Sequence, residues 1–236
     1  LLDDEVGEVL DTLEATGVAD NTLVIFASDH GDMLGDHRLL VKGAIFYDAG
    51  IRVPLLARWP GRIGPGTVVD TPVQLNDIAA TVVAAAGCEP PWAPEEDPLV
   101  GRDLGPLIRG EVDRVRDDTV CLYRNTGINR IDRDWDPPLN GSMILRDGLK
   151  LSLFHDEPEP GARGELYDLE RDPHELVNLW DDPDYAEART DLLLALIDWL
   201  ARHESAYLGS RGGMATVPKD SYVDNRLHTK GDSDHA

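Results

Sequence analysis

The chain has 236 residues, enough for one large domain or about one and a half ordinary ones. Hydrophobic residues make up 42% of it, which is enough to form a sizeable core. Its 45 acidic and 22 basic residues give a net charge of −23. This charge argues against nucleic acid as a partner, because phosphates demand a basic protein face. No run of about 18 apolar residues occurs, so we expect no membrane-spanning helix. The two cysteines, Cys88 and Cys121, form no CxxC pair and cannot build a disulfide framework.

The beginning of the chain predicts an amphipathic helix that already includes the first residues. Apolar side chains recur there at helical spacing, namely Leu2, Val6, Val9, Leu10 and Leu13. Neither a methionine nor a signal peptide precedes them, so we interpret an upstream portion of the protein as missing. The compartment stays open. Abundant aspartate and only four lysines suggest a salt-adapted cytoplasm, and an ordinary acidic bacterial protein is the alternative.

Residues 1–115 are predicted to form an α/β unit. The predicted elements, in chain order, are a helix ending near Gly17, strands over 22–29, 53–59 and 67–71, a helix from about Asn76 to Gly87, a linker over 88–100 and a short helix over 104–109. The run over 22–29 is apolar and β-branched, which suits a strand buried on both faces of a parallel sheet. Strands with a helix before and after them favour α/β layering.

Residues 116–208 are predicted to form a small α+β subdomain of antiparallel strands with a terminal helix. Strands are expected over 119–124, 143–146 and 149–154, a strand and turn over 165–173, and a helix over 186–203. The Asp147-Gly148 pair between apolar runs is a strong hairpin signal, because type I′ turns need positive φ. Residues 209–236 are polar and are expected to form an extended tail.

The candidate chemistry lies directly after the first apolar strand. Asp29 and His30 are adjacent there, and ligands bind beyond the carboxyl ends of strands in open α/β sheets. The pair offers a carboxylate oxygen and an imidazole nitrogen to a cation. Taken by themselves, however, the two residues favour a helix cap and a hydrogen-bonded histidine over a metal site.

The surrounding sequence resembles the sulfatase family of the alkaline phosphatase superfamily. The resemblance covers roughly residues 1–200 in the right order, and its segments are 21–56, Gln74 to Gly87, and Glu165 to Leu179. The Asp-His version of the pair is similar to members such as choline sulfatase, iduronate sulfatase and phosphonate monoester hydrolase. The resemblance implies the C-terminal part of an alkaline-phosphatase-like sandwich of mostly parallel sheet and helices.

The same resemblance implies roles for three residues. Asp29 and His30 match the second pair of metal ligands in the family, and Lys42 matches the lysine that contacts the ester oxygens of the substrate. Its positive charge suits a transition state in which negative charge builds on those oxygens. The metal is expected to be Ca²⁺, with Mn²⁺ as the alternative because imidazole suits softer cations.

Four neighbouring residues are weaker candidates. His37 could support the site by bonding a ligand carboxylate. For Asp32 and Asp36 a solvated loop is favoured over metal ligation, and Arg52 is expected to bridge layers rather than bind substrate.

A nucleophile has no candidate in this chain. Sulfatases use a formylglycine made from the cysteine of a Cys-x-Pro-x-Arg motif, whereas Cys88 is followed by Glu-Pro-Pro-Trp and comes after a helix rather than before one. Cys121 lies in a predicted strand. We therefore expect the formylglycine in a missing N-terminal half, and expect this chain alone to bind metal weakly and turn over nothing.

The sequence thus predicts a metal-dependent sulfuric ester hydrolase acting on a small sulfate or phosphate ester. A phosphonate monoester or phosphodiester hydrolase of the same superfamily is the alternative. An inactive fragment that serves as a binding or assembly module is a third hypothesis. Substrate identity and oligomeric state stay open.

Overall fold

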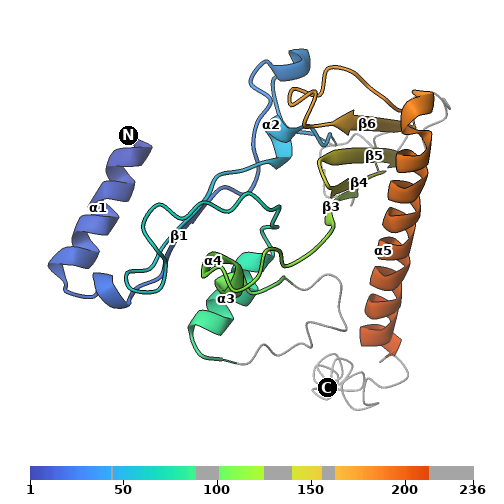
Figure 1. Ribbon diagram of the computed structural model, residues 1–236. Coiled ribbons are helices and arrows are strands. Elements are labelled where there is room, and N and C mark those ends of the chain that lie inside the picture. The colour runs from blue at the N-terminus through green and yellow to red at the C-terminus, as the bar shows by residue number, and fades with distance from the viewer. Residues whose placement is uncertain (44, 89–100, 125–139, 156–162, 213–236) are drawn as a thin grey trace, which may run out of the picture.

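A computed structural model describes residues 1–43, 45–88, 101–124, 140–155 and 163–212 (Figure 1). The helices are α1 (Leu2–Ala15), α2 (Asp48–Ile51), α3 (Asp77–Ala85), α4 (Gly105–Ile108) and α5 (Ala186–Gly212), with 3-10 turns at Ala19–Asn21, Asp36–Arg38 and Pro183–Tyr185. The strands are β1 (Val24–Ala27), β2 (Leu55–Arg58), β3 (Thr119–Arg124), β4 (Asn140–Arg146), β5 (Leu149–His155) and β6 (Gly164–Asp168). The mixed α/β class is confirmed. None of the described helices is both long and apolar enough to cross a membrane.

The first sheet differs from the expectation of parallel strands. β1 and β2 pair antiparallel, from Val24 opposite Arg58 to Ala27 opposite Leu55. The chain between them folds back through a loop and the single turn of α2, so it lacks the long covering helix that joins parallel neighbours. All four β1 residues are half-buried rather than fully buried.

The strand expected over 67–71 is also wrong, because that segment is irregular. A turn explains the difference. The Thr67 hydroxyl donates to the Gly64 carbonyl at 2.8 Å, and its N–H reaches the same oxygen at 3.2 Å. Threonine that bonds its own backbone in this way competes with a strand ladder. The helix stops are confirmed, since Gly17 and Gly87 both have positive φ directly after α1 and α3.

The second sheet is the antiparallel meander β3-β4-β5-β6, as predicted for the C-terminal part. Its hairpin turns at Asp147 and Gly148, with φ of 47° and 79°, the two positive values that a type I′ turn requires. The register aligns one row across all four strands, made of Val120, Ile144, Leu151 and Leu166. Leu192 and Leu196 of α5 complete this core, and Figure 1 shows α5 along the sheet.

The expected linker and tail are only partly described. Residues 89–100 and 213–236 lie outside the described residues. α5 runs to Gly212, so the first residues assigned to the tail continue the helix.

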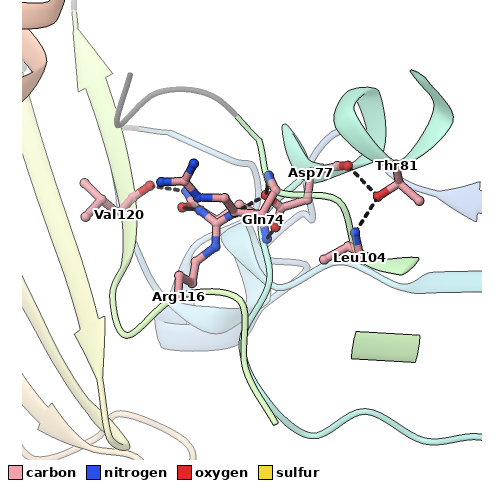
Figure 2. Close-up of polar contacts among 7 residues, drawn as sticks. Gln74, Asp77, Thr81, Leu104, Arg116 and Val120 are labelled. Carbon is pink, nitrogen blue, oxygen red and sulfur yellow. Dashed lines mark hydrogen bonds and ion pairs between the residues drawn. The ribbon is translucent and has the colours of Figure 1, made fainter. Parts of the chain in front are cut away.

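A buried carboxylate joins the two parts of the chain. Asp77, at the start of α3, is fully buried and accepts the backbone N–H groups of Gln74 and Arg102, each at 2.7 Å. It also forms an ion pair with Arg116 (Figure 2). The Gln74 side chain in turn donates to the carbonyl of Val120 in β3 at 2.7 Å. The resemblance segment from Gln74 thus connects α3 to the second sheet.

Thr81 extends this network by one helical turn. Its hydroxyl donates to the Asp77 carbonyl at 2.7 Å and accepts the N–H of Leu104 at 2.9 Å, just before α4 (Figure 2). The backbone approaches so closely here that a Cβ on Gly101 would lie 1.9 Å from the Asn76 carbonyl oxygen. The spacing of Gln74, Asp77 and Thr81 therefore serves to pack α3, α4 and β3 together.

We expect Asp77→Asn to lower the free energy of unfolding by about 3 kcal/mol, because it leaves the Arg116 guanidinium buried without its charge partner. Urea unfolding followed by circular dichroism measures the change. The matched control is Asp117→Asn, whose carboxylate pairs with Arg114 at 3.2 Å on the surface. That change should cost no more than about 1 kcal/mol. Equal losses in both variants would contradict the role given to Asp77.

Candidate active site

Asp29 and His30 follow β1 in a loop held by its own side chains. The Ser28 hydroxyl donates to the His30 carbonyl at 2.8 Å, and the His30 N–H donates to Asp29 Oδ1 at 3.0 Å. The other carboxylate oxygen, Asp29 Oδ2, lies 3.3 Å from His30 Nε2. The two predicted ligands therefore present an oxygen and a nitrogen side by side.

The tautomer of His30 follows from its neighbours. Nδ1 lies 2.9 Å from the Gly31 carbonyl oxygen, which can only accept, so Nδ1 carries the proton in the neutral ring. Nε2 then has a free lone pair, and the Lys42 ammonium donates to it. A metal ion requires this same lone pair. The structure thus brings Asp29, His30 and Lys42 together around one atom.

Gly31 fixes this loop against α2. Its N–H donates to the Gly50 carbonyl at 2.9 Å. A Cβ at Gly31 would lie 2.0 Å from the carbonyl oxygen of Ala49, a backbone atom that has little room to move. Only glycine fits at this contact, so α2 sets the position of the residue next to His30.

Asp32 has a role that the sequence did not reveal. Its Oδ1 accepts the backbone N–H of Lys42 at 2.6 Å, across ten residues of chain. The expectation that Asp32 belongs to a solvated loop therefore misses this tether. Much of the loop between the two residues is exposed, with Leu34, Leu40 and Val41 open to solvent, whereas Met33 is buried. Asp36 takes part in that loop through backbone turn bonds to Met33 and Leu39.

The His37 side chain packs against a neighbouring ring, whereas the Arg52 side chain is exposed. The His37 ring stacks on Tyr47 with centroids 3.7 Å apart and planes 5° from parallel, so its support of a ligand carboxylate stays a prediction. The Arg52 side chain is 83% exposed and lies 3.5 Å from Asp48 of the same helical turn. Arg52 therefore does not bridge layers.

Charge around the pair favours the ionised carboxylate. Partial loss of hydration works to raise the pKa of Asp29. The neighbouring His30, backbone N–H groups and the Lys42 charge outweigh it and lower the pKa below its usual value. An ionised Asp29 is the form that binds a cation.

The donor set suits a divalent ion but is partial. One carboxylate and one imidazole are ligands that Mn²⁺ and related ions accept, whereas Ca²⁺ takes about six to eight oxygens. Across the described ranges, no group of three His, Cys, Asp or Glu side chains could hold a metal ion. Asp29 and His30 therefore fit as part of a larger ligand set.

Neither cysteine resembles a prepared nucleophile. Cys88 is exposed after α3, and the residues of the motif that follow it lie outside the described ranges. Cys121 is half-buried in β3, and burial raises the pKa of its thiol. A thiol with a raised pKa is a poor nucleophile at neutral pH.

Comparison with known proteins relates part of the chain to one family. Residues 1–88 match the family model described as "Sulfatase". The match to a sulfatase family domain therefore lies in residues 1–88. It is 31% identical over 230 residues to the uncharacterized sulfatase YidJ of Escherichia coli, covering 93% of this chain and 40% of that protein. It is 34% identical over 186 residues to the choline-sulfatase of Rhizobium meliloti, covering 77% of this chain and 31% of that protein.

The fold is shared with solved members of the same superfamily. The phosphonate monoester hydrolase of Agrobacterium radiobacter aligns with a TM-score of 0.71 and 32% identity, over 85% of this chain and 39% of that one. The resemblance to sulfatases and to their alkaline-phosphatase-like fold is thus confirmed. Sulfatases generally use a divalent metal. The chain spans 40% or less of the length of each of these three relatives.

We expect Gly31→Ala to destabilise the protein by about 1–3 kcal/mol, since the added methyl group forces the loop away from the Ala49 carbonyl. Thermal or urea unfolding measures the loss. Gly7→Ala is the control, because nothing lies within 4 Å of a Cβ there. In the middle of α1 that change should instead stabilise by about 0.5–1 kcal/mol. Stabilisation by both changes would contradict the close contact at Gly31.

Proposed function

We propose that this chain is part of a metal-dependent sulfuric ester hydrolase in which Asp29 and His30 bind the metal and Lys42 binds the ester. The observation that carries the proposal is that the side chains of Asp29 and Lys42 both lie next to His30 Nε2. The family match over residues 1–88, which contain all three residues, supports it. Ca²⁺ is the ion proposed first and Mn²⁺ is the alternative, because His30 contributes nitrogen.

When bound, the ion supplies a Lewis acid that lowers the pKa of the nucleophile and holds the ester oxygens. The nucleophile, a formylglycine expected outside these 236 residues, stays a prediction. So does the expectation that this chain alone is inactive.

In this proposal Lys42 donates to His30 Nε2 before the metal binds and contacts the ester oxygens afterwards. It cannot do both at once. One lone pair on His30 Nε2 cannot accept from Lys42 and bind a cation together. Ligation by His30 therefore requires the Lys42 ammonium to leave, and its flexible stem allows this. The Asp32 contact keeps the Lys42 backbone in place meanwhile. The freed ammonium then serves the ester oxygens, where negative charge develops in the transition state.

A phosphonate monoester hydrolase is the second candidate, and the likeness to the Agrobacterium radiobacter enzyme favours it. Kinetics on the protein in its natural full length separate the two. An aryl sulfate hydrolysed with the higher kcat/KM supports the first proposal, and an aryl phosphonate monoester the second. Hydrolysis of neither by the metal-loaded protein would overturn both and favour a binding module.

Removal of the metal tests the cofactor. We expect EDTA dialysis to abolish hydrolysis by the full-length protein, and Ca²⁺ or Mn²⁺ to restore it. In His30→Ala the metal dissociation constant should rise at least tenfold, since a ligand is lost; isothermal titration measures it. Full activity after exhaustive chelation would refute the proposed metal site.

Lys42→Met tests the ester contact. We expect kcat/KM to fall by about 10²–10³-fold, the usual effect of removing one group that stabilises developing charge. Metal affinity should not fall, because Lys42 is not a ligand and its ammonium competes with the ion for His30 Nε2. Arg52→Met is the control, since it removes an exposed cation nearby and should change kcat/KM less than about twofold. Comparable losses in both variants would indicate a general effect of charge.

A further inference from the structure

The second sheet has two faces that receive different side chains. Successive residues of β5 point to opposite faces. Leu151 lies in the core beneath α5, so Lys150 points to the other side. Its neighbours there in the register are Leu145 of β4 and Tyr167 of β6. This second face is covered by the segment that leads into α2, where Phe46 stacks against Phe154.

Lys150 is consequently buried, with only 1% of its surface exposed. Its ammonium lies 2.6 Å from Asp48 Oδ1 and forms a second ion pair with Glu175. Glu175 is itself 3% exposed. A buried ammonium is tolerated only when paired, so these contacts hold β5, α2 and the turn after β6 together.

Glu175 also fixes the first turn of α2 directly. Its Oε2 accepts the backbone N–H of Asp48 at 2.7 Å, and this N–H has no partner inside the helix. Glu175 has φ of 55°, in the left-handed region that a residue other than glycine rarely adopts. Such a conformation persists where surrounding contacts enforce it.

The contacts continue from α2 to the candidate metal ligand. Asp48 begins α2, and Gly50 two residues later accepts the Gly31 N–H at 2.9 Å. The Gly31 carbonyl in turn holds His30 Nδ1 at 2.9 Å. That carbonyl determines which nitrogen of His30 has the free lone pair. An unbroken series of short contacts therefore leads from Lys150 to His30 Nε2.

We infer that Lys150, Glu175 and Asp48 are positioning residues for the ligand pair Asp29–His30, an inference that rests on the proposed metal-dependent function. The cluster acts through α2 and Gly31 and touches neither substrate nor metal. Through this cluster the C-terminal sheet holds the metal-ligand loop in the geometry, and His30 in the tautomer, that metal binding needs.

A purely structural role for the cluster makes a different prediction. If the ion pairs only join two parts of the fold, breaking them lowers the free energy of global unfolding. The backbone of the His30 loop then stays as well held as in any other variant of the same stability. Arg146 supplies the matched comparison. It lies in the same sheet and pairs with Asp118 at 2.5 and 2.7 Å, away from α2.

The experiment compares Lys150→Met with Arg146→Met in the full-length protein. Two measurements are made, amide hydrogen exchange of the peptide containing Gly31 and the dissociation constant for Mn²⁺ by electron paramagnetic resonance. In Lys150→Met, exchange at Gly31 should quicken at least tenfold and the dissociation constant should rise about 10–100-fold, the usual cost of losing outer contacts to a metal site. Arg146→Met should change neither by more than about twofold.

Two further variants keep the test decisive. Lys150→Arg retains the charge and should recover most of the Mn²⁺ affinity. Asp48→Asn replaces Lys150→Met if that variant does not fold, because Asp48 is only half-buried. It should show the same two effects.

Unchanged exchange at Gly31 in Lys150→Met or Asp48→Asn, relative to Arg146→Met, would overturn the inference. So would faster exchange with unchanged Mn²⁺ affinity. Failure of the unaltered protein to bind either Ca²⁺ or Mn²⁺ refutes the proposed function instead, and the exchange rates then still report whether the cluster holds the loop.

Discussion

The alternation of side chains along β5 is the constraint on which most of this structure depends. One strand sends Leu151 into the core under α5 and Lys150 into the contact with α2. A shift of register by one residue would exchange the two, leaving an ammonium in an apolar core. The register that builds the C-terminal core is therefore the same one that delivers the cation holding α2.

Two buried carboxylates, each paired with a cation, join the parts of the fold. The chain has a net charge of −23, yet Asp77 and Glu175 are both buried. Each is placed against one cation from the C-terminal part, Arg116 and Lys150 respectively. Breaking such a pair costs far more than losing a surface pair. Most of the negative charge stays in water, and these two sites join the parts of the fold.

Sequence reasoning succeeded where the signal is local and failed where it depends on long-range pairing. Asp147-Gly148 and the stops at Gly17 and Gly87 need only a few neighbouring residues to specify a backbone conformation. The direction in which β1 and β2 pair depends on the chain between them. Burial of Lys150 could not be foreseen either, because alternation alone predicts only that it faces away from Leu151. What covers that face comes from residues a hundred positions earlier.

The candidate site divides in the same way. Adjacent Asp29 and His30 were visible from their place after an apolar strand, and the family resemblance added Lys42. The contacts that hold their backbone were not visible, since Asp32 and Gly31 act through a main-chain N–H and a main-chain carbonyl of other segments. These anchors fix the backbone on both sides of the loop, while the Asp29 carboxylate is 84% exposed. A site with a held backbone and open side chains can exchange the Lys42–His30 contact for a metal ion without refolding the loop.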